Sequence, residues 1–215
     1  MRIAPEGWPF IRVALALDLA LVVVWYSWPG WTVLLLVVGL VLTVWVVAFF
    51  RDPRRAGPRG DGLVIAPADG RICGIAQVDE PVYLHQQATR VSIFMSVLNV
   101  HVNRFPVSGE VEVVHYNPGQ FTVASHDKAS LVNEQASVGI ESPRGPVLVR
   151  QIAGSIARRI VTDVGPGDHA AQGERFGMIR FGSRVDLFLD PAVKITVAMN
   201  QHVRGGETVI GEYPA

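Results

Sequence analysis

Hydrophobic residues are concentrated in the first fifty positions of the chain, in two runs that a short break separates. The first run, residues 13–28, contains one charged residue, Asp18, and the second, residues 31–50, contains none. A helix of about twenty residues, rising 1.5 Å per residue, crosses a hydrocarbon core of about 30 Å. The break contains a Pro-Gly pair, which ends helices, next to aromatic residues that favour the bilayer interface. The pattern predicts a helical hairpin over residues 1–50 that crosses the membrane or dips into one leaflet.

Arginine residues flank this hairpin on both sides. Arg2 and Arg12 precede it, and a segment rich in Arg, Pro and Gly, residues 51–61, follows it. Positively charged flanks stay in the cytoplasm, so the rest of the chain is expected at the cytoplasmic face of the cell (inner) membrane. Residues 51–61 are predicted to form a basic linker, whose arginines either contact anionic lipid headgroups or only set the topology. A cleaved signal peptide is a competing interpretation, which the longer second run and the missing small-residue cleavage site disfavour.

Short apolar runs alternate with glycine-containing turns throughout residues 62–215. Strands are predicted at residues 62–66, 90–102, 110–116, 147–153, 185–189 and 193–198, and short helices only at 129–133 and 155–161. Two strand–turn–strand units, around Asp69 and around Gly165-Pro166-Gly167-Asp168, are similar to the barrel-sandwich hybrid of biotinyl and lipoyl carriers, without the lysine that carries the cofactor. The predicted fold class is a mainly β (α+β) domain with barrel-sandwich-hybrid-like elements, preceded by the membrane hairpin.

The composition argues against several classes of protein. A formal net charge of zero disfavours a nucleic-acid partner, since such proteins normally carry a basic excess. The single cysteine, Cys73, excludes an internal disulfide and leaves no set of thiols for zinc, so no metal is expected. Pyridoxal phosphate needs a lysine, and Lys128 and Lys194 both lack glycine-rich phosphate-binding surroundings. The chain has no P-loop, GxGxxG or HExxH motif either. Any electrophile must therefore come from another source.

One Gly-Ser pair, Gly154 and Ser155, follows an apolar run and precedes a cationic segment. Glycine allows strained backbone angles and leaves its carbonyl open to attack by the neighbouring hydroxyl. The same residues also suit a strand-to-helix turn in which the serine caps the helix. The pair alone leaves both interpretations open.

A set of ordered blocks around this pair resembles the phosphatidylserine decarboxylase family, in its short bacterial and archaeal form. The blocks cover nearly everything after residue 60. Together with the Gly-Ser pair they are Pro67-Ala68-Asp69-Gly70, Phe94-Met95-Ser96, Asn99-Val100-His101-Val102-Asn103-Arg104, Pro106-Val107-Ser108-Gly109, Tyr116-Asn117-Pro118-Gly119-Gln120-Phe121, Asn133-Glu134 and Gly177-Met178-Ile179-Arg180-Phe181-Gly182-Ser183.

The resemblance implies a self-cleaving pyruvoyl enzyme that converts phosphatidylserine to phosphatidylethanolamine and CO2. Ser155 attacks the Gly154 carbonyl, the amide becomes an ester, and elimination leaves dehydroalanine, which hydrolyses to a pyruvoyl group with loss of ammonia. The products are a β chain, residues 1–154, and an α chain, residues 155–215, that form a heterodimer; a higher oligomer is left open. The pyruvoyl group is the expected cofactor, and its ketone forms a Schiff base with the amine of the lipid substrate.

Self-cleavage also needs a base, and decarboxylation needs a proton donor. The resemblance makes His101 the candidate for both. In an extended segment Asn99, His101 and Asn103 share one face, and Asp69 is expected to orient the imidazole. A satisfied core histidine and a turn-forming aspartate are the structural alternatives.

Longer family members carry two histidines three residues apart, and Arg104 occupies the second position here. Arg104 is expected to contact the substrate carboxylate or phosphate, with Asn99 and Asn103 as further substrate contacts. His115 and His126 are reserve candidates for proton transfer. Two other functions stay open: decarboxylation of archaetidylserine or another serine phospholipid, and a non-enzymatic membrane adaptor with a carrier-like β domain.

Overall fold

Two apolar helices and a set of antiparallel strands make up the chain. The structure, a computed structural model, describes residues 2–119, 133–154, 159–180 and 183–214. Its residues divide into two units, Met1–Arg54 and Arg55–Ala215. The first contains the helices and the second nearly all of the strands, so the prediction of a mainly β domain preceded by two apolar helices is confirmed.

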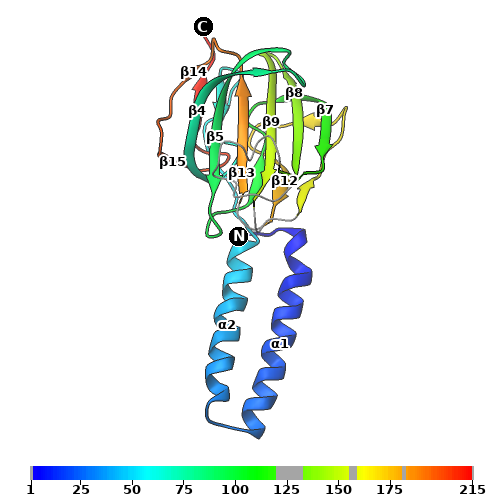
Figure 1. Cartoon of the computed structure of the whole chain (residues 1–215), viewed down its shortest axis with the longest axis vertical. Helices are drawn as coiled ribbons and strands as arrows, with labels where there is room; N and C mark the ends of the chain where they lie inside the picture. The colour runs from blue at the N-terminus through cyan, green and yellow to red at the C-terminus, as the bar shows by residue number, and fades with distance from the viewer. Residues whose placement is uncertain (1, 120–132, 155–158, 181–182, 215) are drawn as a thin grey trace. The chain divides into compact units, whose positions relative to one another are not determined.

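The first unit is a helical hairpin. Helix α1 (Trp8–Ser27) packs antiparallel against helix α2 (Thr32–Phe49), and both are long and apolar enough to cross a membrane (Figure 1). A short 3-10 turn, η1 (Pro5–Gly7), precedes α1, and strands β1 (Arg2–Ile3) and β2 (Arg51–Asp52) pair at the open end of the hairpin. Helix α1 begins five residues before the predicted apolar run, and its first turn contains Pro9, at a position where no backbone N–H is needed.

Asp18, the charged residue of the first apolar run, lies between the two helices. Its side chain is buried, with 6% exposed, and its Oδ2 accepts a hydrogen bond of 2.6 Å from the Thr43 hydroxyl of α2. Gly39 leaves room for it, since a Cβ there would lie 2.6 Å from Asp18 Oδ1. An unpaired carboxyl group is expensive in hydrocarbon, so this bond offsets part of the cost of placing Asp18 in an apolar helix.

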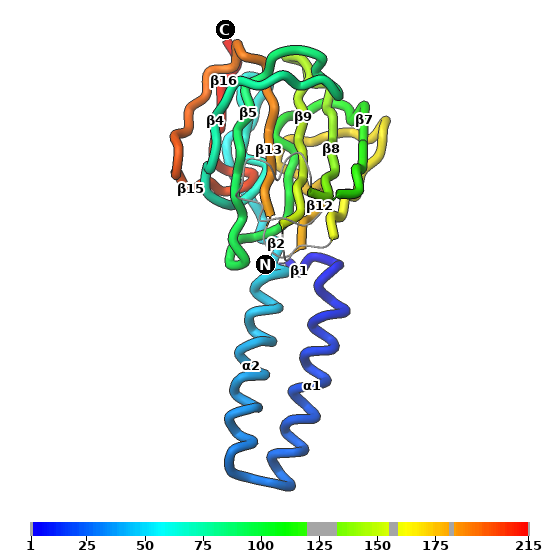
Figure 2. The backbone as a smooth tube through the Cα atoms, viewed as in Figure 1, coloured from blue at the N-terminus to red at the C-terminus, as the bar shows by residue number. Residues whose placement is uncertain are grey.

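The second unit is built around an eight-stranded antiparallel sheet in the order β11-β7-β8-β9-β13-β5-β4-β15. Strand β13, near the C-terminus of the chain, lies between β9 and β5 in the middle of this sheet (Figures 1 and 2). The strands of this sheet are β4 (Gly70–Glu80), β5 (Gln86–Met95), β7 (Gly109–Asn117), β8 (Gln135–Ser142), β9 (Gly145–Ala153), β11 (His169–Ala170), β13 (Ser183–Leu189) and β15 (His202–Val203).

Two three-stranded sheets complete the second unit. One has the order β10-β12-β6 and the other β14-β16-β3. Their strands are β3 (Leu63–Ile65), β6 (Val102–Arg104), β10 (Ile160–Thr162), β12 (Arg175–Ile179), β14 (Lys194–Ile195) and β16 (Val209–Glu212). One face of the large sheet packs with residues of both small sheets into a single apolar core, to which β9 contributes Val147, Val149 and Ala153.

The predicted strands at 110–116, 147–153 and 185–189 are confirmed as β7, β9 and β13. The strand predicted over 90–102 is wrong as one element, because a turn at residues 97–99 separates β5 from β6. Of the strand predicted at 193–198, only β14 is present. The helix predicted at 155–161 is wrong at residues 160–161, which belong to β10 and pair with β12. The helix predicted at 129–133 lies outside the described residues except for its last position. The two strand–turn–strand units are present as β3–β4 and β10–β11, in different sheets, and their likeness to a barrel-sandwich hybrid stays a prediction.

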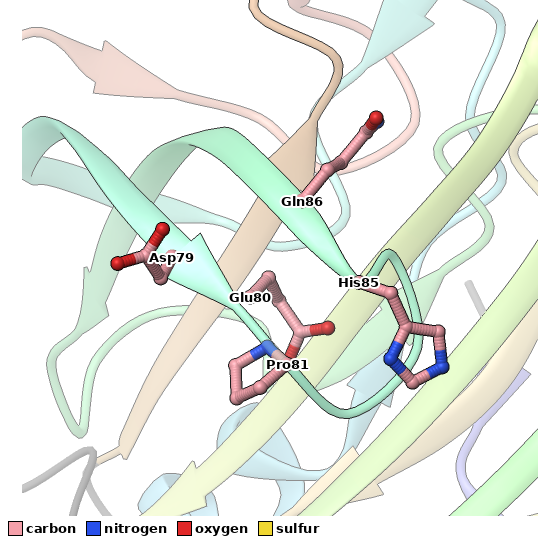
Figure 3. Close-up of a pocket in the computed structure, with 5 residues that line it drawn as sticks. All are labelled: Asp79, Glu80, Pro81, His85 and Gln86. Carbon is pink, nitrogen blue, oxygen red and sulfur yellow. The ribbon is translucent and has the colours of Figure 1, made fainter.

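The loop between β4 and β5 folds over the other face of the large sheet. Glu80 fixes it: Oε1 forms a 2.9 Å ion pair with Arg150 of β9, and Oε2 accepts hydrogen bonds from three consecutive backbone N–H groups, residues 82–84. The Tyr83 ring packs on Gly139 of β8, where a Cβ would come within 2.8 Å. Figure 3 shows Glu80 at the base of this loop, beside Pro81 and opposite His85.

These contacts change the proton affinity of Glu80. Burial alone raises the pKa of a carboxyl group, but the N–H groups of Tyr83 and Leu84 and the Arg150 guanidinium outweigh it and lower the pKa of Glu80. A carboxylate with a lowered folded-state pKa stabilises the fold above its unfolded pKa of about 4.3. That stability is lost as the pH falls through the folded-state pKa.

We expect Glu80→Gln to lower the free energy of unfolding by roughly 1–3 kcal/mol at pH 7, because Arg150 loses its charged partner. The difference from the wild type should shrink between pH 5 and pH 3, as measured by denaturant titration at several pH values. Glu110→Gln, at an exposed position of β7, is the control. A difference that stays constant down to pH 3 would contradict the assignment.

Candidate active site

Strand β9 ends directly before the Gly-Ser pair. Gly154 is buried and follows Ala153, the last residue of the strand. Ala153 pairs with Ser183 of β13, and the preceding Ile152 pairs with Gln135 of β8. Ser155 lies outside the described residues. The predicted cleavage bond therefore follows a strand that is held on both sides.

The backbone of Ala153 is bound at both of its polar groups. Its N–H donates to the Glu134 carbonyl at 2.9 Å, and its carbonyl accepts a hydrogen bond of 2.7 Å from the Asn133 side-chain amide. These contacts are made by one of the blocks on which the family resemblance depends. The last residue before Gly154 has a fixed orientation as a result.

A chain of buried polar side chains connects β9 to β6. Gln151 projects from β9 between Val149 and Ala153, and its amide donates to Asn103 Oδ1 of β6 at 2.8 Å. Thr162 of β10 donates to Gln151 Oε1 at 3.0 Å, and the Asn103 amide lies 3.8 Å from the Met95 sulfur. Gln151 and Asn103 have no exposed surface. Since a buried amide without partners costs about 1–3 kcal/mol, these bonds tie the two strands together.

His101 is buried just before β6, two residues from Asn103. Its Nδ1 lies 3.0 Å from the backbone carbonyl of Asn99. A carbonyl only accepts hydrogen bonds, so a neutral His101 carries its proton on Nδ1, and Nε2 is the basic nitrogen. The tautomer that a general base requires is thus set by the main chain.

Asn99, His101 and Asn103 do not lie in one extended segment, which is the geometry that the expectation of a shared face assumed. Asn99 lies in a bend, and its Oδ1 accepts hydrogen bonds from the Ser96 N–H and hydroxyl, both at 2.8 Å. Asn103 points instead to Gln151. The turn that ends β5 therefore removes the extended geometry on which the expectation depended.

Asp69 forms a different contact from the predicted one with His101. Its two carboxylate oxygens accept hydrogen bonds of 2.9 and 2.7 Å from Arg55, and Oδ1 also accepts the Gly205 N–H at 2.8 Å. These are the partners of Asp69 among the described residues, and the imidazole is oriented by a carbonyl instead. A planar guanidinium matches a carboxylate in two-point contact, which explains why Arg55 takes this position.

Arg104 is buried as well. Its Nη1 donates to the Gly173 carbonyl at 3.2 Å, and its backbone N–H donates to Pro67 O at 2.9 Å. Arg104 and Arg55 both pack against Gly206, where a Cβ would lie 2.9 and 3.2 Å from their side chains. The structure therefore gathers Asp69, Arg55 and Arg104 around the turn at residues 204–207.

Two arginines of the predicted basic linker are occupied within the second unit. Arg55 is paired with Asp69 and lies 3.4 Å from Glu207, while Arg59 donates to the Gly206 carbonyl at 2.9 Å. Both guanidinium groups therefore bind groups of the second unit, and contact of the basic cluster with lipid headgroups stays a prediction.

The two pockets found on the β4–β5 loop side do not include the predicted site residues, apart from a reserve candidate. One, of about 310 Å³, is lined by Asp79, Glu80, Pro81, His85 and Gln86 (Figure 3). The other, of about 380 Å³, is lined by residues of β4, β7, β8 and β9, including His115. The other reserve candidate, His126, lies outside the described residues, which contain no cluster of three metal-binding side chains.

Comparison with known proteins fits this arrangement. The family model described as "Phosphatidylserine decarboxylase" matches residues 42–211. The chain is also 48% identical, over 98% of its length and 95% of the relative's, to the "Phosphatidylserine decarboxylase proenzyme" of Nitrosomonas eutropha. The chain belongs to the phosphatidylserine decarboxylase family. The resemblance expected from its ordered blocks is confirmed.

The sequence did not predict three side-chain hydrogen bonds: Asn133 to Ala153, Gln151 to Asn103, and Arg55 to Asp69. A signal existed for Gln151, because a polar residue in an alternating strand, on the apolar face, needs a buried partner. No comparable signal marked Arg55, whose segment has the composition of a linker.

Proposed function

We propose that this chain is the proenzyme of a phosphatidylserine decarboxylase and cleaves itself between Gly154 and Ser155. The product then converts phosphatidylserine to phosphatidylethanolamine and CO2. The observation that carries this proposal is the end of β9, where a clamped Ala153 precedes a buried Gly154 and Gln151 connects the same strand to the His101 segment. The identity to a decarboxylase proenzyme over nearly the whole chain supports it.

His101 is the proposed base for self-cleavage. With Nδ1 bound to the Asn99 carbonyl, its Nε2 can take the proton of the Ser155 hydroxyl as the oxygen attacks the Gly154 carbon. The carbon–nitrogen bond breaks and the nitrogen gains a proton, which leaves an ester. In this scheme Asn99 and Asn103 support the position of His101. Asp69 and Arg104 organise the turn at 204–207, and contacts of Asn99, Asn103 and Arg104 with substrate stay predictions.

The surroundings of Gly154 fit a pyruvoyl group at position 155. In the sheet, the end of β9 is flanked by the uncharged side chains of Ser183 and Gln135 and by the backbone carbonyl of Glu134. These neighbours support an uncharged pyruvoyl group after Gly154. A pyruvoyl group at this position would supply an electrophilic carbonyl for the amine of the serine headgroup and an acceptor for the electrons released with CO2.

Cleavage at this bond would leave two chains that share one sheet. Strand β13 of the α chain lies between β9 and β5 of the β chain, and all seven of its residues are buried. Strands β11, β12, β15 and β16 of the α chain likewise pair with β7, β6, β4 and β3 of the β chain. The predicted heterodimer is therefore an interdigitated one, which separates only on unfolding.

The helical hairpin is the proposed membrane anchor. The outer faces of α1 and α2 expose large apolar side chains such as Leu17, Leu19 and Val44, which suit lipid better than water. An anchor at the cytoplasmic face of the cell membrane would hold the domain beside a lipid substrate. The headgroup chemistry does not choose the lipid tail, so archaetidylserine stays an alternative substrate.

Ser155→Ala tests the central proposal. We expect the variant to remain one uncleaved chain without decarboxylase activity, because the attacking hydroxyl is missing. The wild type should give residues 1–154 and 155–215 on a denaturing gel and by intact mass, the smaller chain lacking a free N-terminal amine. Wild-type protein that stays intact would favour a non-enzymatic adaptor, and a Ser155→Ala chain that still splits here would contradict the assignment.

His101→Ala should slow self-cleavage by about a hundredfold or more, since general base catalysis contributes about 10²–10⁴. The rate is followed by the appearance of the α chain on gels. His202→Ala, at an exposed position of β15, is the matched control and should mature normally. A fully processed and fully active His101→Ala enzyme would remove this residue from the mechanism.

Removal of residues 1–50 should leave self-cleavage intact, because the predicted site residues all belong to the second unit. Activity on vesicles should fall at least about tenfold relative to activity on a soluble short-chain phosphatidylserine, since the anchor raises the local concentration of lipid. An equal loss on both substrates would argue against a tethering role.

A further inference from the structure

At Ala153, the residue before Gly154, a side chain takes the place of a backbone donor in the hydrogen-bond ladder of β9. In an antiparallel strand the N–H and the C=O of one residue point to the same neighbouring strand. At Ala153 the N–H meets the Glu134 carbonyl at 2.9 Å, as a ladder requires. Its C=O is met at 2.7 Å by the Asn133 side-chain amide. Asn133 thus supplies the donor that a backbone amide would otherwise provide.

The Asn133–Glu134 peptide is itself held firmly. Asn133 is buried, with 1% of its surface exposed. Gly119 packs on this peptide so closely that a Cβ would lie 2.3–2.5 Å from Asn133 C, Asn133 O and Glu134 N. The Tyr116 hydroxyl, on β7, donates to Glu134 Oε1 at 2.9 Å. The donor to Ala153 is therefore fixed from the side of β7.

The contact to Ala153 restricts the peptide that leads into the proposed cleavage bond. An amide group is planar, so holding the Ala153 carbonyl fixes the plane of the Ala153–Gly154 peptide. The direction of the Gly154 carbonyl then depends on the two torsions of Gly154 alone. Glycine has the widest range of these torsions. If the peptide plane before it were also free to rotate, the Gly154 carbonyl could adopt still more orientations. Small misplacements of reacting groups lower rates steeply, by up to about a hundredfold per ångström.

We propose that Asn133 is a positioning residue for self-cleavage and acts through the Ala153 carbonyl. This inference rests on the proposed function, because it requires Ser155 to attack the Gly154 carbonyl. In that step the hydroxyl oxygen bonds to the Gly154 carbon, the carbon–nitrogen bond breaks, and the hydroxyl proton ends on the nitrogen. The Asn133 amide neither gives nor takes a proton. By holding the Ala153 carbonyl, the Asn133 amide reduces the number of orientations in which the Gly154 carbonyl points away from the attacking hydroxyl.

The experiment uses the full-length precursor and the variants Asn133→Ala and Asn133→Ser. Alanine removes the donor, and serine keeps a hydroxyl that is too short to replace it. We expect both to slow self-cleavage by roughly 10–100-fold, measured as the rate at which the α chain appears on gels and by intact mass. The pH dependence of the cleavage rate should keep its wild-type shape, since Asn133 does not titrate.

Loss of stability is separated from loss of positioning by two controls. Gln172→Ala removes a comparable buried amide, whose Nε2 donates to Leu63 O at 2.8 Å and Pro106 O at 3.1 Å, outside the β8–β9–β13 strands. Thermal unfolding of each variant is measured in the Ser155→Ala background, where every precursor stays uncleaved. If the Asn133 variants and Gln172→Ala lose the same amount of Tm, the rate of self-cleavage should still be much lower in the Asn133 variants.

The outcomes distinguish this inference from the function on which it rests. A wild-type precursor that is never cut between Gly154 and Ser155 overturns the proposed function itself. A wild type that is cut normally, with Asn133 variants that mature at its rate, overturns only the role of Asn133. The same holds if the Asn133 and Gln172 variants slow in proportion to their loss of Tm, or if the pH profile shifts.

Discussion

Strand β9 is hydrogen-bonded along both of its edges, and this pairing fixes the position of the residues that lead to Gly154. The strand is paired with β8 along one edge and with β13 along the other, up to Ala153. Gly154 follows the last paired residue. A cut after Gly154 therefore removes a covalent link but none of the ladder bonds of the described residues. A chain that cleaves its own backbone keeps its fold only if the cleaved bond lies outside the hydrogen-bonded part of the strand, as the proposed bond does.

The buried polar bonds of the core satisfy polar groups and fix distances at the same time. Gln151 needs a partner because it lies between Val149 and Ala153 on the apolar face of the sheet. Asn103 provides it, and in doing so sets how β6 lies against β9. His101 is two residues from Asn103, so its distance from the end of β9 is controlled by a bond that the core cannot lose cheaply. The stability of the domain and the position of His101, the proposed base, depend here on the same side chains.

Much of this architecture is visible in the sequence, and the missing parts have physical reasons. Alternation predicts β7, β9 and β13 because each has one face in the core. It fails at residues 97–99, where a turn interrupts an otherwise continuous pattern. The helix prediction fails at β10, whose three β-branched residues favour a strand, and this strand pairs with β12. The ordered blocks identify the family, and they surround the proposed cleavage pair. They do not reveal that Arg55 binds Asp69, because that contact joins segments fourteen residues apart through side chains alone.

The position of β13 in the middle of the sheet affects how the protein could refold after cleavage. Before a cut at Gly154, the strand belongs to the same chain as its neighbours, and refolding is a first-order process. Afterwards a separate chain must find a gap in the middle of a sheet, and recovery from unfolding depends on the concentration of both fragments. Maturation would thus convert a reversible folding equilibrium into a kinetic trap. The mature protein would persist because it unfolds slowly, and an unfolded copy would seldom be recovered.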